Sequence, residues 1–318
     1  MTFRERFNRR LLRYLTEGSP GLAVPAGIPE TLGFLAGRLA RHPATLLLAG
    51  GRWRVRWPQG FDLYYTAKFN SVTHHYVATG SYEDAELNLV QANLRADSVF
   101  LDIGANVGLF SLLAARVIQT GRIFSFEPLP ETHRDLLANI ALNRAADRIE
   151  PLALALSDRS GEGYITSDFH ASNFLVDASA VSPKQPIALS TLDAFAAARR
   201  FERIDLIKLD VEGCELSVLR GGLATLRRFQ PMLLVELIEQ PVEFHERAVP
   251  DHHAAIELLA GLGYQHYVVD DHGAIVPGPA FKAEAAARSY HNYLFYLPGR
   301  HEPVLGPAVT PGISGPES

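Results

Sequence analysis

From residue 98 onward, strand-like and helix-like patterns alternate, and this alternation constrains the fold of the 318-residue chain more than any other feature. Short apolar runs that alternate with amphipathic segments predict βαβ units and a mostly parallel, buried sheet. We expect seven strands, over residues 99–103, 122–127, 149–156, 206–209, 232–237, 264–269 and 293–297. We expect helices over residues 108–117, 131–142, 191–199, 215–220 and 252–259. No helical pattern separates the last two strands, so the predicted α/β sheet ends with an antiparallel strand.

The alternation also divides the chain into three parts. Residues 81–298 are expected to form one α/β domain, which begins with a helical pattern over 81–94. Residues 1–80 form an N-terminal extension, with a helix predicted over 30–41 and β-prone segments over 53–57, 63–65 and 73–78. Residues 299–318 are rich in proline, glycine and serine, and we expect them to be disordered.

Charge and cysteine content exclude several classes of protein. The chain has 30 Lys and Arg against 35 Asp and Glu, and a net charge of −5 argues against a nucleic-acid partner. The single cysteine, Cys214, excludes an intramolecular disulfide and a cysteine-rich zinc site. Neither a membrane-spanning run nor a signal-peptide core is found, so we expect a cytoplasmic protein. Residues 1–15 alternate arginines with apolar residues, which is typical of a helix on a membrane surface or of a solvated helix laid on the domain.

The first expected strand of the domain runs into a glycine-rich turn, Asp102-Ile-Gly104-Ala-Asn106-Val-Gly108. Glycines at such a turn let the backbone approach a ligand closely, and the next helix offers free N–H groups there. A dinucleotide motif requires a third glycine that is missing here, and Asp102 would repel a pyrophosphate. The turn therefore favours a positively charged sulfonium ligand over a pyrophosphate.

The second expected strand ends at Glu127, 23 residues after the first glycine of the turn. A carboxylate at that place can accept hydrogen bonds from the two hydroxyls of a ribose. The residue thus indicates an adenosine-containing ligand. It does not choose between a nicotinamide dinucleotide and S-adenosylmethionine.

Several further motifs lie at the spacing of one known family. They are Gly80-Ser-Tyr-Glu83, the turn Asp102–Gly108, Glu127-Pro128, Ala155-Leu-Ser-Asp158, Ser190-Thr-Leu-Asp193, Ile207-Lys-Leu-Asp-Val-Glu-Gly-Cys-Glu215 and Val218-Leu-Arg-Gly221. Over about residues 80–240 the chain resembles the FkbM family of S-adenosylmethionine-dependent methyltransferases. The resemblance implies the Rossmann-like fold of class I methyltransferases, with S-adenosylmethionine as cofactor.

The resemblance also implies a role for each matching residue. Around the methionine part of the cofactor it places Asp102, Gly104, Asn106 and Gly108. It gives the ribose to Glu127, the adenine to Ser157 and Asp158, and the surroundings of the methyl group to Asp210.

Transfer of a methyl group to an alcohol requires alignment of the reactants and a base for the hydroxyl proton. Asp210 and Glu212 follow the fourth strand at the carboxyl edge of the sheet, and we predict that they supply this base. Glu236, near the end of the fifth strand, could add a third carboxylate, and the group could instead bind a divalent metal that the sequence does not require. In another interpretation, Glu212 pairs with a nearby basic residue and holds the loop. Histidines 74, 75 and 170 are alternative bases or lining residues.

These observations predict an S-adenosylmethionine-dependent O-methyltransferase that acts on a small-molecule or glycan acceptor. The family resemblance implies a hydroxyl of a sugar, a glycolipid or a secondary metabolite as the group that is methylated. Two other functions stay open at this point. They are an NAD(P)-dependent oxidoreductase and a non-catalytic adenosine-binding protein.

Overall fold

The computed structural model describes a large part of the chain and divides it into two compact units, Met1–Tyr82 and Glu83–Ser318. The described residues are 45–49, 52–66, 71–167, 175–176, 183–238, 252–270, 272–281 and 290–305. Each unit is described by itself below. The helix predicted over 30–41, the basic segment 1–15 and His170 lie outside the described residues.

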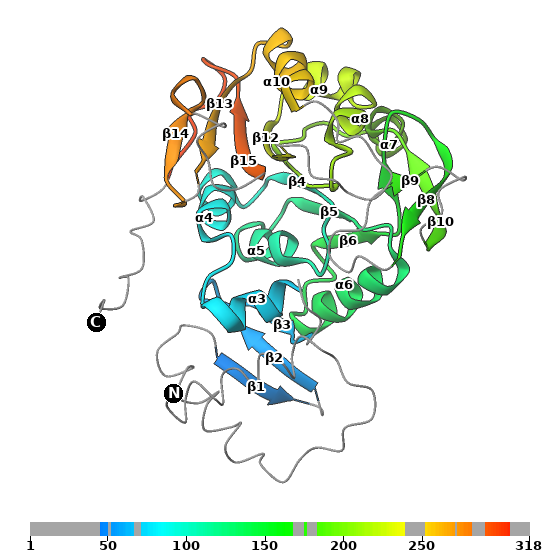
Figure 1. Cartoon of the computed structure of the whole chain (residues 1–318), viewed down its shortest axis with the longest axis vertical. Coiled ribbons are helices and arrows are strands. Elements are labelled where there is room, and N and C mark those ends of the chain that lie inside the picture. The colour runs from blue at the N-terminus through cyan, green and yellow to red at the C-terminus, as the bar shows by residue number, and fades with distance from the viewer. Residues whose placement is uncertain are drawn as a thin grey trace. The chain divides into compact units, whose positions relative to one another are not determined.

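The second unit is built on an eight-stranded sheet (Figure 1). Its strands are β4 (Val99–Ile103), β5 (Arg122–Phe126), β6 (Ile149–Leu152), β11 (Leu206–Leu209), β12 (Met232–Ile238), β13 (Gln265–Val269), β14 (Ile275–Pro277) and β15 (Tyr290–Tyr296). Their order across the sheet is β14-β13-β15-β12-β11-β4-β5-β6. Strands β6, β5, β4, β11 and β12 pair in parallel, whereas β15 is antiparallel to both β12 and β13. The predicted Rossmann-like α/β fold with an antiparallel last strand is confirmed, and the short strand β14 extends the predicted seven-stranded sheet.

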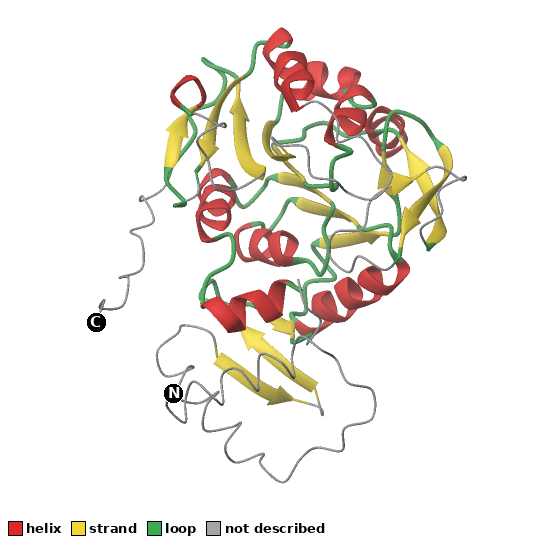
Figure 2. Cartoon of the chain, in the orientation of Figure 1, coloured by secondary structure: helices red, strands yellow, loops and turns green. Residues whose placement is uncertain are grey.

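Helices cover the sheet on both faces (Figure 2). One layer contains α4 (Asp84–Asn93), α5 (Leu109–Val117) and α6 (Pro130–Leu142). The other layer contains α7 (Leu192–Arg199), α8 (Glu215–Arg220), α9 (Leu223–Phe229) and α10 (His252–Gly261). Of these, only α9 was not predicted from the sequence. It begins where the carboxylate of Asp193 accepts hydrogen bonds from the N–H groups of Ala224 and Thr225, a long-range cap that has no local sequence signal.

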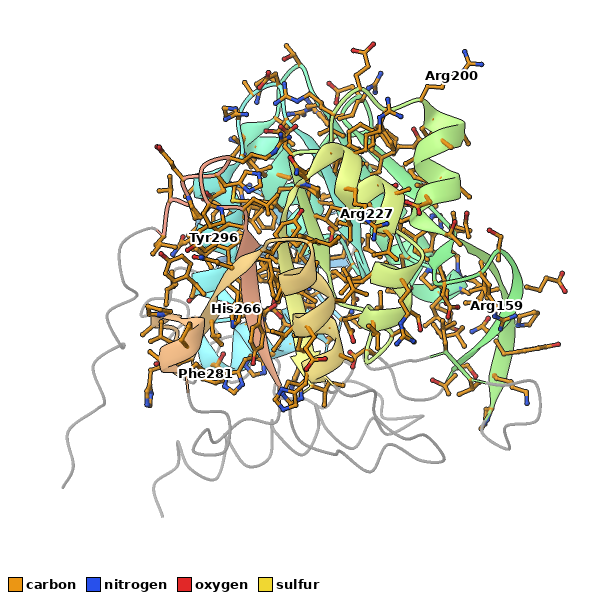
Figure 3. The ribbon with its side chains drawn as sticks, turned by 90° about the horizontal axis from the view of Figure 1, so that it is seen from above. Arg159, Arg200, Arg227, His266, Phe281 and Tyr296 are labelled. Carbon is orange, nitrogen blue, oxygen red and sulfur yellow. The ribbon has the colours of Figure 1, made fainter. Side chains whose placement is uncertain are left out.

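The core lies between the central strands and these helices. Strands β4, β11 and β12 are apolar along most of their length because a parallel sheet is buried on both faces. Phe195 of α7 packs edge to face against Phe124 and Phe126 of β5, with ring centroids 5.9 and 4.8 Å apart. Charged side chains such as Arg159, Arg200 and Arg227 point outward (Figure 3).

A second, four-stranded sheet follows β6 and was not predicted. It contains β7 (Ala155–Leu156), β8 (Gly161–Thr166), β9 (Leu175–Val176) and β10 (Lys184–Ser190), in the order β7-β10-β8-β9. The single strand predicted over 149–156 was therefore wrong: it is two strands, since the chain leaves the large sheet after Leu152 and pairs again with β10. Residues 160–163, Ser-Gly-Glu-Gly, have low strand propensity, so the sequence pattern does not predict β8.

The first unit contains an antiparallel sheet of β1 (Thr45–Ala49), β2 (Arg52–Arg56) and β3 (Asp62–Tyr64), and helix α3 (Val72–Thr79). The β-prone interpretation of residues 73–78 was wrong, because this segment is α3. Ser71 caps the helix by accepting a hydrogen bond from the N–H of His74, and Gly80 ends it with a left-handed backbone at φ 84°. These two caps outweigh the strand propensity of the residues between them.

Part of the expected tail is ordered against the second unit. The side-chain oxygen of Asn93 accepts a hydrogen bond from the N–H of Val304, and its amide donates to the Val304 carbonyl. The remainder of the tail, 306–318, lies outside the described residues. In the part of the chain that the structure describes, none of the helices is long and apolar enough to cross a membrane.

Replacing Phe195 with alanine is expected to destabilise the second unit by about 3–5 kcal/mol, because it empties the space between α7 and β5. Chemical denaturation monitored by circular dichroism measures this loss. Leu137→Ala is the control, since Leu137 is 43% exposed on α6 and its removal should change stability by less than about 1 kcal/mol. Equal losses in the two variants would contradict the packing described here.

Candidate functional site

The glycine turn after β4 lies directly against the ends of two neighbouring strands. Gly104 has a left-handed backbone at φ 85°, and its N–H donates to the carbonyl of Phe126, 3.0 Å away, at the end of β5. On the side of β11, a Cβ atom on Gly104 would lie 1.7 Å from the carbonyl oxygen of Asp210. Only glycine fits this place, so the turn, β5 and β11 meet without an intervening side chain.

The rest of the turn leads the chain into α5. Asn106 and Gly108 also have positive φ angles, 49° and 94°, and Gly108 immediately precedes the helix. A Cβ atom on Gly108 would lie 2.7 Å from the side chain of Leu136 on α6. Asn139 of α6 donates a hydrogen bond to the carbonyl of Val107. Gly108 therefore serves the packing of α5 against α6, and it does not line the pocket described next.

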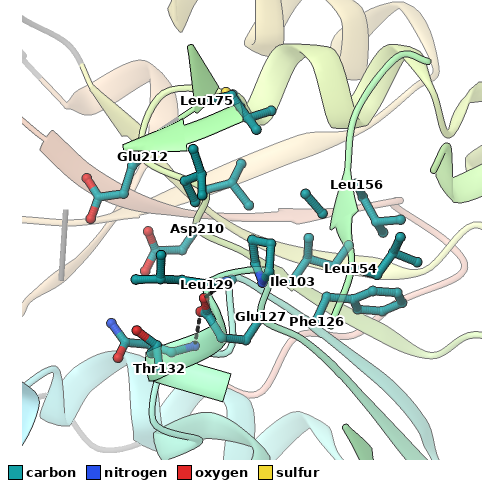
Figure 4. Close-up of a pocket in the computed structure, with 17 residues that line it drawn as sticks. Ile103, Phe126, Glu127, Leu129, Thr132, Leu154, Leu156, Leu175, Asp210 and Glu212 are labelled. Carbon is teal, nitrogen blue, oxygen red and sulfur yellow. Dashed lines mark hydrogen bonds between the residues drawn. The ribbon is translucent and has the colours of Figure 1, made fainter. Parts of the chain in front are cut away.

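A pocket of about 720 Å³, including the solvent at its mouth, opens above this turn (Figure 4). Its wall combines the turn, the segment after β5, the second sheet and the loop after β11. The lining residues are Ile103, Gly104, Asn106, Phe126, Glu127, Pro128, Leu129, Thr132, Leu154, Ala155, Leu156, Ile165, Leu175, Asp210, Val211, Glu212 and Cys214. Five of the predicted site residues thus come together in one cavity: Gly104, Asn106, Glu127, Asp210 and Glu212.

Glu127 lies where β5 ends and is 8% exposed. Its two carboxylate oxygens accept hydrogen bonds from the backbone N–H groups of Asn106, at 3.1 Å, and Leu129, at 2.9 Å (Figure 4). Burial raises the pKa of Glu127 to about 7, although these two hydrogen bonds oppose the shift. The carboxylate is thereby fixed in direction and ready to accept hydrogen bonds from a ligand.

Asp102 lies in β4, two residues before Gly104, and does not line the pocket. The hydroxyl of Ser111 on α5 donates to one oxygen of its carboxylate at 2.5 Å, and Ser111 is in turn 2.6 Å from the hydroxyl of Ser125. Burial raises the pKa of Asp102 to about 6. Its other oxygen, Oδ1, is buried and has no hydrogen-bond partner among the described residues. The geometry gives Asp102 contacts that support the turn, and its predicted contact with the methionine part of a cofactor stays a prediction.

Two further carboxylates that line the pocket, those of Asp210 and Glu212, lie on the loop after β11. Asp210 follows the strand, and Glu212 and Gly213 both adopt left-handed backbones, at φ 52° and 84°. Glu215, at the start of α8, accepts hydrogen bonds from the N–H groups of Val211 and Gly213, both at 3.0 Å. Burial raises the pKa of Glu215 to about 7. Glu215 thus fixes the loop that presents Asp210 and Glu212 to the pocket.

Lys208 and Glu236 lie behind Asp210. The ammonium of Lys208 is 2.5 Å from Oδ2 of Asp210. In the register of the parallel strands β11 and β12, Leu209 pairs with Val235, so Asp210, just after β11, is level with Glu236, which lies within β12. Burial, and then repulsion by Asp210, raises the pKa of Glu236 well above its ordinary value. Glu236 does not line the pocket.

Ser157 and Asp158, which the resemblance places near the adenine, lie just beyond the pocket wall. Ser157 is 5% exposed, and its carbonyl packs against Gly221, where a Cβ atom would approach it to 2.1 Å. Asp158 is exposed. Neither lines the pocket, and their roles toward an adenine stay predictions.

The apolar end of the pocket was not foreseen from the sequence. Phe126, Leu154, Leu156, Ile165 and Leu175 line it. Ile165 and Leu175 come from β8 and β9, the second sheet, whose strands had no clear sequence signal. Apolar side chains of this kind suit contact with an aromatic ring.

The candidate histidines and metal site receive no support from these contacts. His74 belongs to α3 of the first unit, where burial lowers its pKa and the hydroxyl of Tyr65 lies 3.4 Å from its Nδ1. Among the residues that the structure describes, no three histidine, cysteine, aspartate or glutamate side chains are grouped so as to hold a metal ion.

The chain matches known methyltransferases in two kinds of sequence comparison. Residues 102–266, just over half of the chain, match the model of the methyltransferase FkbM domain. Methyltransferase sdnD of Sordaria araneosa is 31% identical over 161 residues, 41% of this chain and 62% of sdnD. The 2-O-methyltransferase NoeI of Sinorhizobium fredii is 31% identical over 192 residues, 52% of this chain and 75% of NoeI. The match thus spans less than two thirds of the length of sdnD.

A solved structure is also similar in part. The methyltransferase FkbM from Methylobacillus flagellatus is 17% identical in sequence, with a TM-score of 0.41. The similar region covers 64% of this chain and 44% of that one.

Replacing Gly104 with alanine is expected to destabilise the protein by more than about 3 kcal/mol and to abolish ligand binding, because the new methyl group would overlap the Asp210 carbonyl. Gly161→Ala is the matched control. Gly161 also has a positive φ, 130°, but nothing lies within 4 Å of its Cβ position, so only backbone strain of about 1–2 kcal/mol is expected. Urea unfolding compares the two variants. Similar losses would show that the close approach at Gly104 is unimportant.

Glu127→Gln is expected to raise the free energy of unfolding of the ligand-free protein more at pH 8 than at pH 5. The difference between the two gains is about 2 kcal/mol. The raised pKa of about 7 means that the folded state holds a proton on Glu127 that the unfolded state has lost above about pH 4.5. The resulting destabilisation of the folded state grows as the pH rises above about 4.5 and reaches its full size above the folded-state pKa of about 7. The neutral amide of glutamine does not titrate and avoids this destabilisation. Urea unfolding at both pH values measures the difference, with exposed Glu202→Gln as the control. A gain that is the same at both pH values would contradict the prediction.

Proposed function

This chain belongs to the FkbM methyltransferase family, and we propose that it transfers a methyl group from S-adenosylmethionine to a hydroxyl group of a small-molecule or glycan acceptor. The observation that carries the proposal is the convergence of Gly104, Glu127 and Asp210 on one pocket. Three strand ends supply one function each: close backbone approach, a fixed acceptor of hydrogen bonds and a negative charge.

The pocket fits S-adenosylmethionine part by part. Glu127, fixed by two backbone N–H groups, matches the two ribose hydroxyls. The apolar end around Phe126, Leu156 and Ile165 matches an adenine ring. The carboxylates of Asp210 and Glu212 match the positive sulfonium, and Gly104 leaves room for the chain that bears it.

The glycine turn also disfavours the dinucleotide alternative. Asn106 lines the pocket at the place where a pyrophosphate would need an approach without a side chain. Asp210 and Glu212, the charged groups other than Glu127 that line the pocket, are carboxylates and would repel phosphate groups.

When bound, S-adenosylmethionine supplies a methyl group on a positively charged sulfur that is already activated for displacement. The protein must then hold the acceptor in line and take its proton. Asp210 and Glu212 lie on the loop that Glu215 fixes and both line the pocket, with their carboxylates on the same side of the view in Figure 4. We assign Asp210 as the group that receives the hydroxyl proton and Glu212 as a group that orients the acceptor.

The acceptor class rests on the family and on chemistry. NoeI, to which the chain is similar, is a 2-O-methyltransferase. Carboxylates such as Asp210 and Glu212 accept hydrogen bonds from neighbouring hydroxyls, which suits a sugar or another polyhydroxylated molecule. These features favour a hydroxyl of a sugar, a glycolipid or a secondary metabolite.

Isothermal titration calorimetry with S-adenosylmethionine tests the cofactor. Wild type is expected to bind, and Glu127→Ala is expected to bind at least about 10-fold more weakly because it loses charged hydrogen bonds to the ribose. Asp147→Asn is the control, since Asp147 is 72% exposed beside Arg148. Absence of heat with wild type, or unchanged affinity of Glu127→Ala, would overturn the assignment.

Transfer of radiolabelled methyl groups to a panel of sugars and glycolipids tests the catalytic carboxylates. Asp210→Asn is expected to lower kcat by about 100-fold or more, and Glu212→Gln by about 10-fold. The assignment of the base fails if both variants retain full activity. Binding of S-adenosylmethionine by wild type without turnover of any acceptor would instead favour a binding protein.

A further inference from the structure

Lys208 is a buried cation that has no role in the reaction proposed above. Its side chain is 2% exposed and lies in β11, two residues before Asp210. The ammonium is 2.5 Å from Oδ2 of Asp210 and 4.9 Å from the centre of the Phe110 ring on α5. A lysine is rarely buried to this extent, because removing an ammonium from water is unfavourable unless opposite charges compensate.

The surrounding carboxylates supply that compensation. Burial alone would lower the pKa of Lys208, but the attraction of Asp210, Glu83 and Glu236 outweighs it and raises the pKa above its ordinary value. Strand register adds a fourth carboxylate, since Lys208 of β11 pairs with Asp102 of β4. The ammonium therefore stays charged and acts as the shared counterion of this part of the site.

Asp210 is the member of this group that reaches the pocket. Its side chain is 23% exposed and lines the cavity, whereas Lys208 lies behind it. Because Lys208 engages Oδ2, the other oxygen, Oδ1, is left for a molecule in the pocket. The ion pair thus fixes the direction of the carboxylate.

We propose that Lys208 is a positioning residue for methyl transfer, which supplies the counter-charge of Asp210 and holds its Oδ1 toward the acceptor. This inference rests on the function proposed above for the same site. Lys208 itself touches neither acceptor nor cofactor; it acts through Asp210.

The charges that face Asp210 are mostly negative, which is why the cation matters. Asp102 approaches from β4, Glu127 from the end of β5 and Glu236 from β12. Glu215 approaches from α8. Glu212 of the loop and Glu83 at the start of α4 act on the neighbouring Glu236. Without Lys208, Asp210 would face these carboxylates without its adjacent ammonium, and its ionised form would be disfavoured.

The main experiment compares Lys208→Met with Lys208→Arg across pH. In Lys208→Met, the acidic limb of kcat/KM for methyl transfer is expected to move up by about one pH unit or more, so that activity relative to wild type falls on the acidic side and recovers as the pH rises. Lys208→Arg keeps the charge and should keep the limb near its wild-type position. A loss of equal size at every pH, or an acidic limb in Lys208→Met that does not move, would overturn the proposal.

A second measurement needs neither cofactor nor turnover. In the ligand-free protein, the ¹³C signal of the Asp210 carboxyl, assigned with Asp210→Asn, should titrate at a higher pH in Lys208→Met than in wild type. An unshifted titration overturns the role of Lys208. Failure of wild type to bind S-adenosylmethionine would instead overturn the proposed function and leave this titration interpretable.

The double variant Lys208→Met/Glu236→Gln covers the case in which Lys208→Met does not fold. It removes one buried carboxylate together with the cation, which preserves the formal charge of the cluster. The Asp210 signal is expected to shift upward in this variant too, but by less than in Lys208→Met, because the repulsion from Glu236 is lost together with the adjacent ammonium. A wild-type titration curve in the double variant would contradict the proposal.

Discussion

The close approach of Gly104 to the carbonyl oxygen of Asp210 is the contact on which the rest of the site depends. A Cβ atom at Gly104 would lie 1.7 Å from that oxygen, and on the other side the Gly104 N–H bonds to the Phe126 carbonyl. The turn after β4 is thereby held between the ends of β5 and β11. Because Glu127 follows β5 and Asp210 follows β11, this close approach brings the two carboxylates into the lining of the same pocket.

Concentrating carboxylates at one edge of a sheet has an electrostatic consequence. Burial raises the pKa of Asp102 to about 6 and of Glu127 and Glu215 to about 7. A positively charged ligand would offset the repulsion among these buried carboxylates. Backbone N–H groups on Glu127 and Glu215, and the ammonium of Lys208 on Asp210, compensate part of the unfavourable burial. Several of the carboxylates that make the chain acidic thus lie at the edge of the sheet where a cationic cofactor is proposed to bind.

The parts of this arrangement that the sequence predicts are those with a local pattern. The apolar strands, the turn from Asp102 to Gly108 and the strand-end carboxylates Glu127 and Asp210 all have such a pattern, and the family resemblance agreed with it. Contacts between distant segments do not have one. The cap that Asp193 gives to α9, the loop that Glu215 fixes and the wall supplied by Ile165 and Leu175 depend on tertiary packing. Local caps at Ser71 and Gly80 likewise turned a β-prone segment into α3.

The central claim is that the pocket above Gly104 binds S-adenosylmethionine between Glu127 and Asp210. A crystal structure of the chain with S-adenosylhomocysteine tests it most directly. The account predicts ribose hydroxyls about 2.6–3.2 Å from the Glu127 carboxylate, the adenine among Phe126, Leu156 and Ile165, and the sulfur on the side of Asp210. A ligand bound elsewhere, or one whose ribose lies away from Glu127, would contradict it.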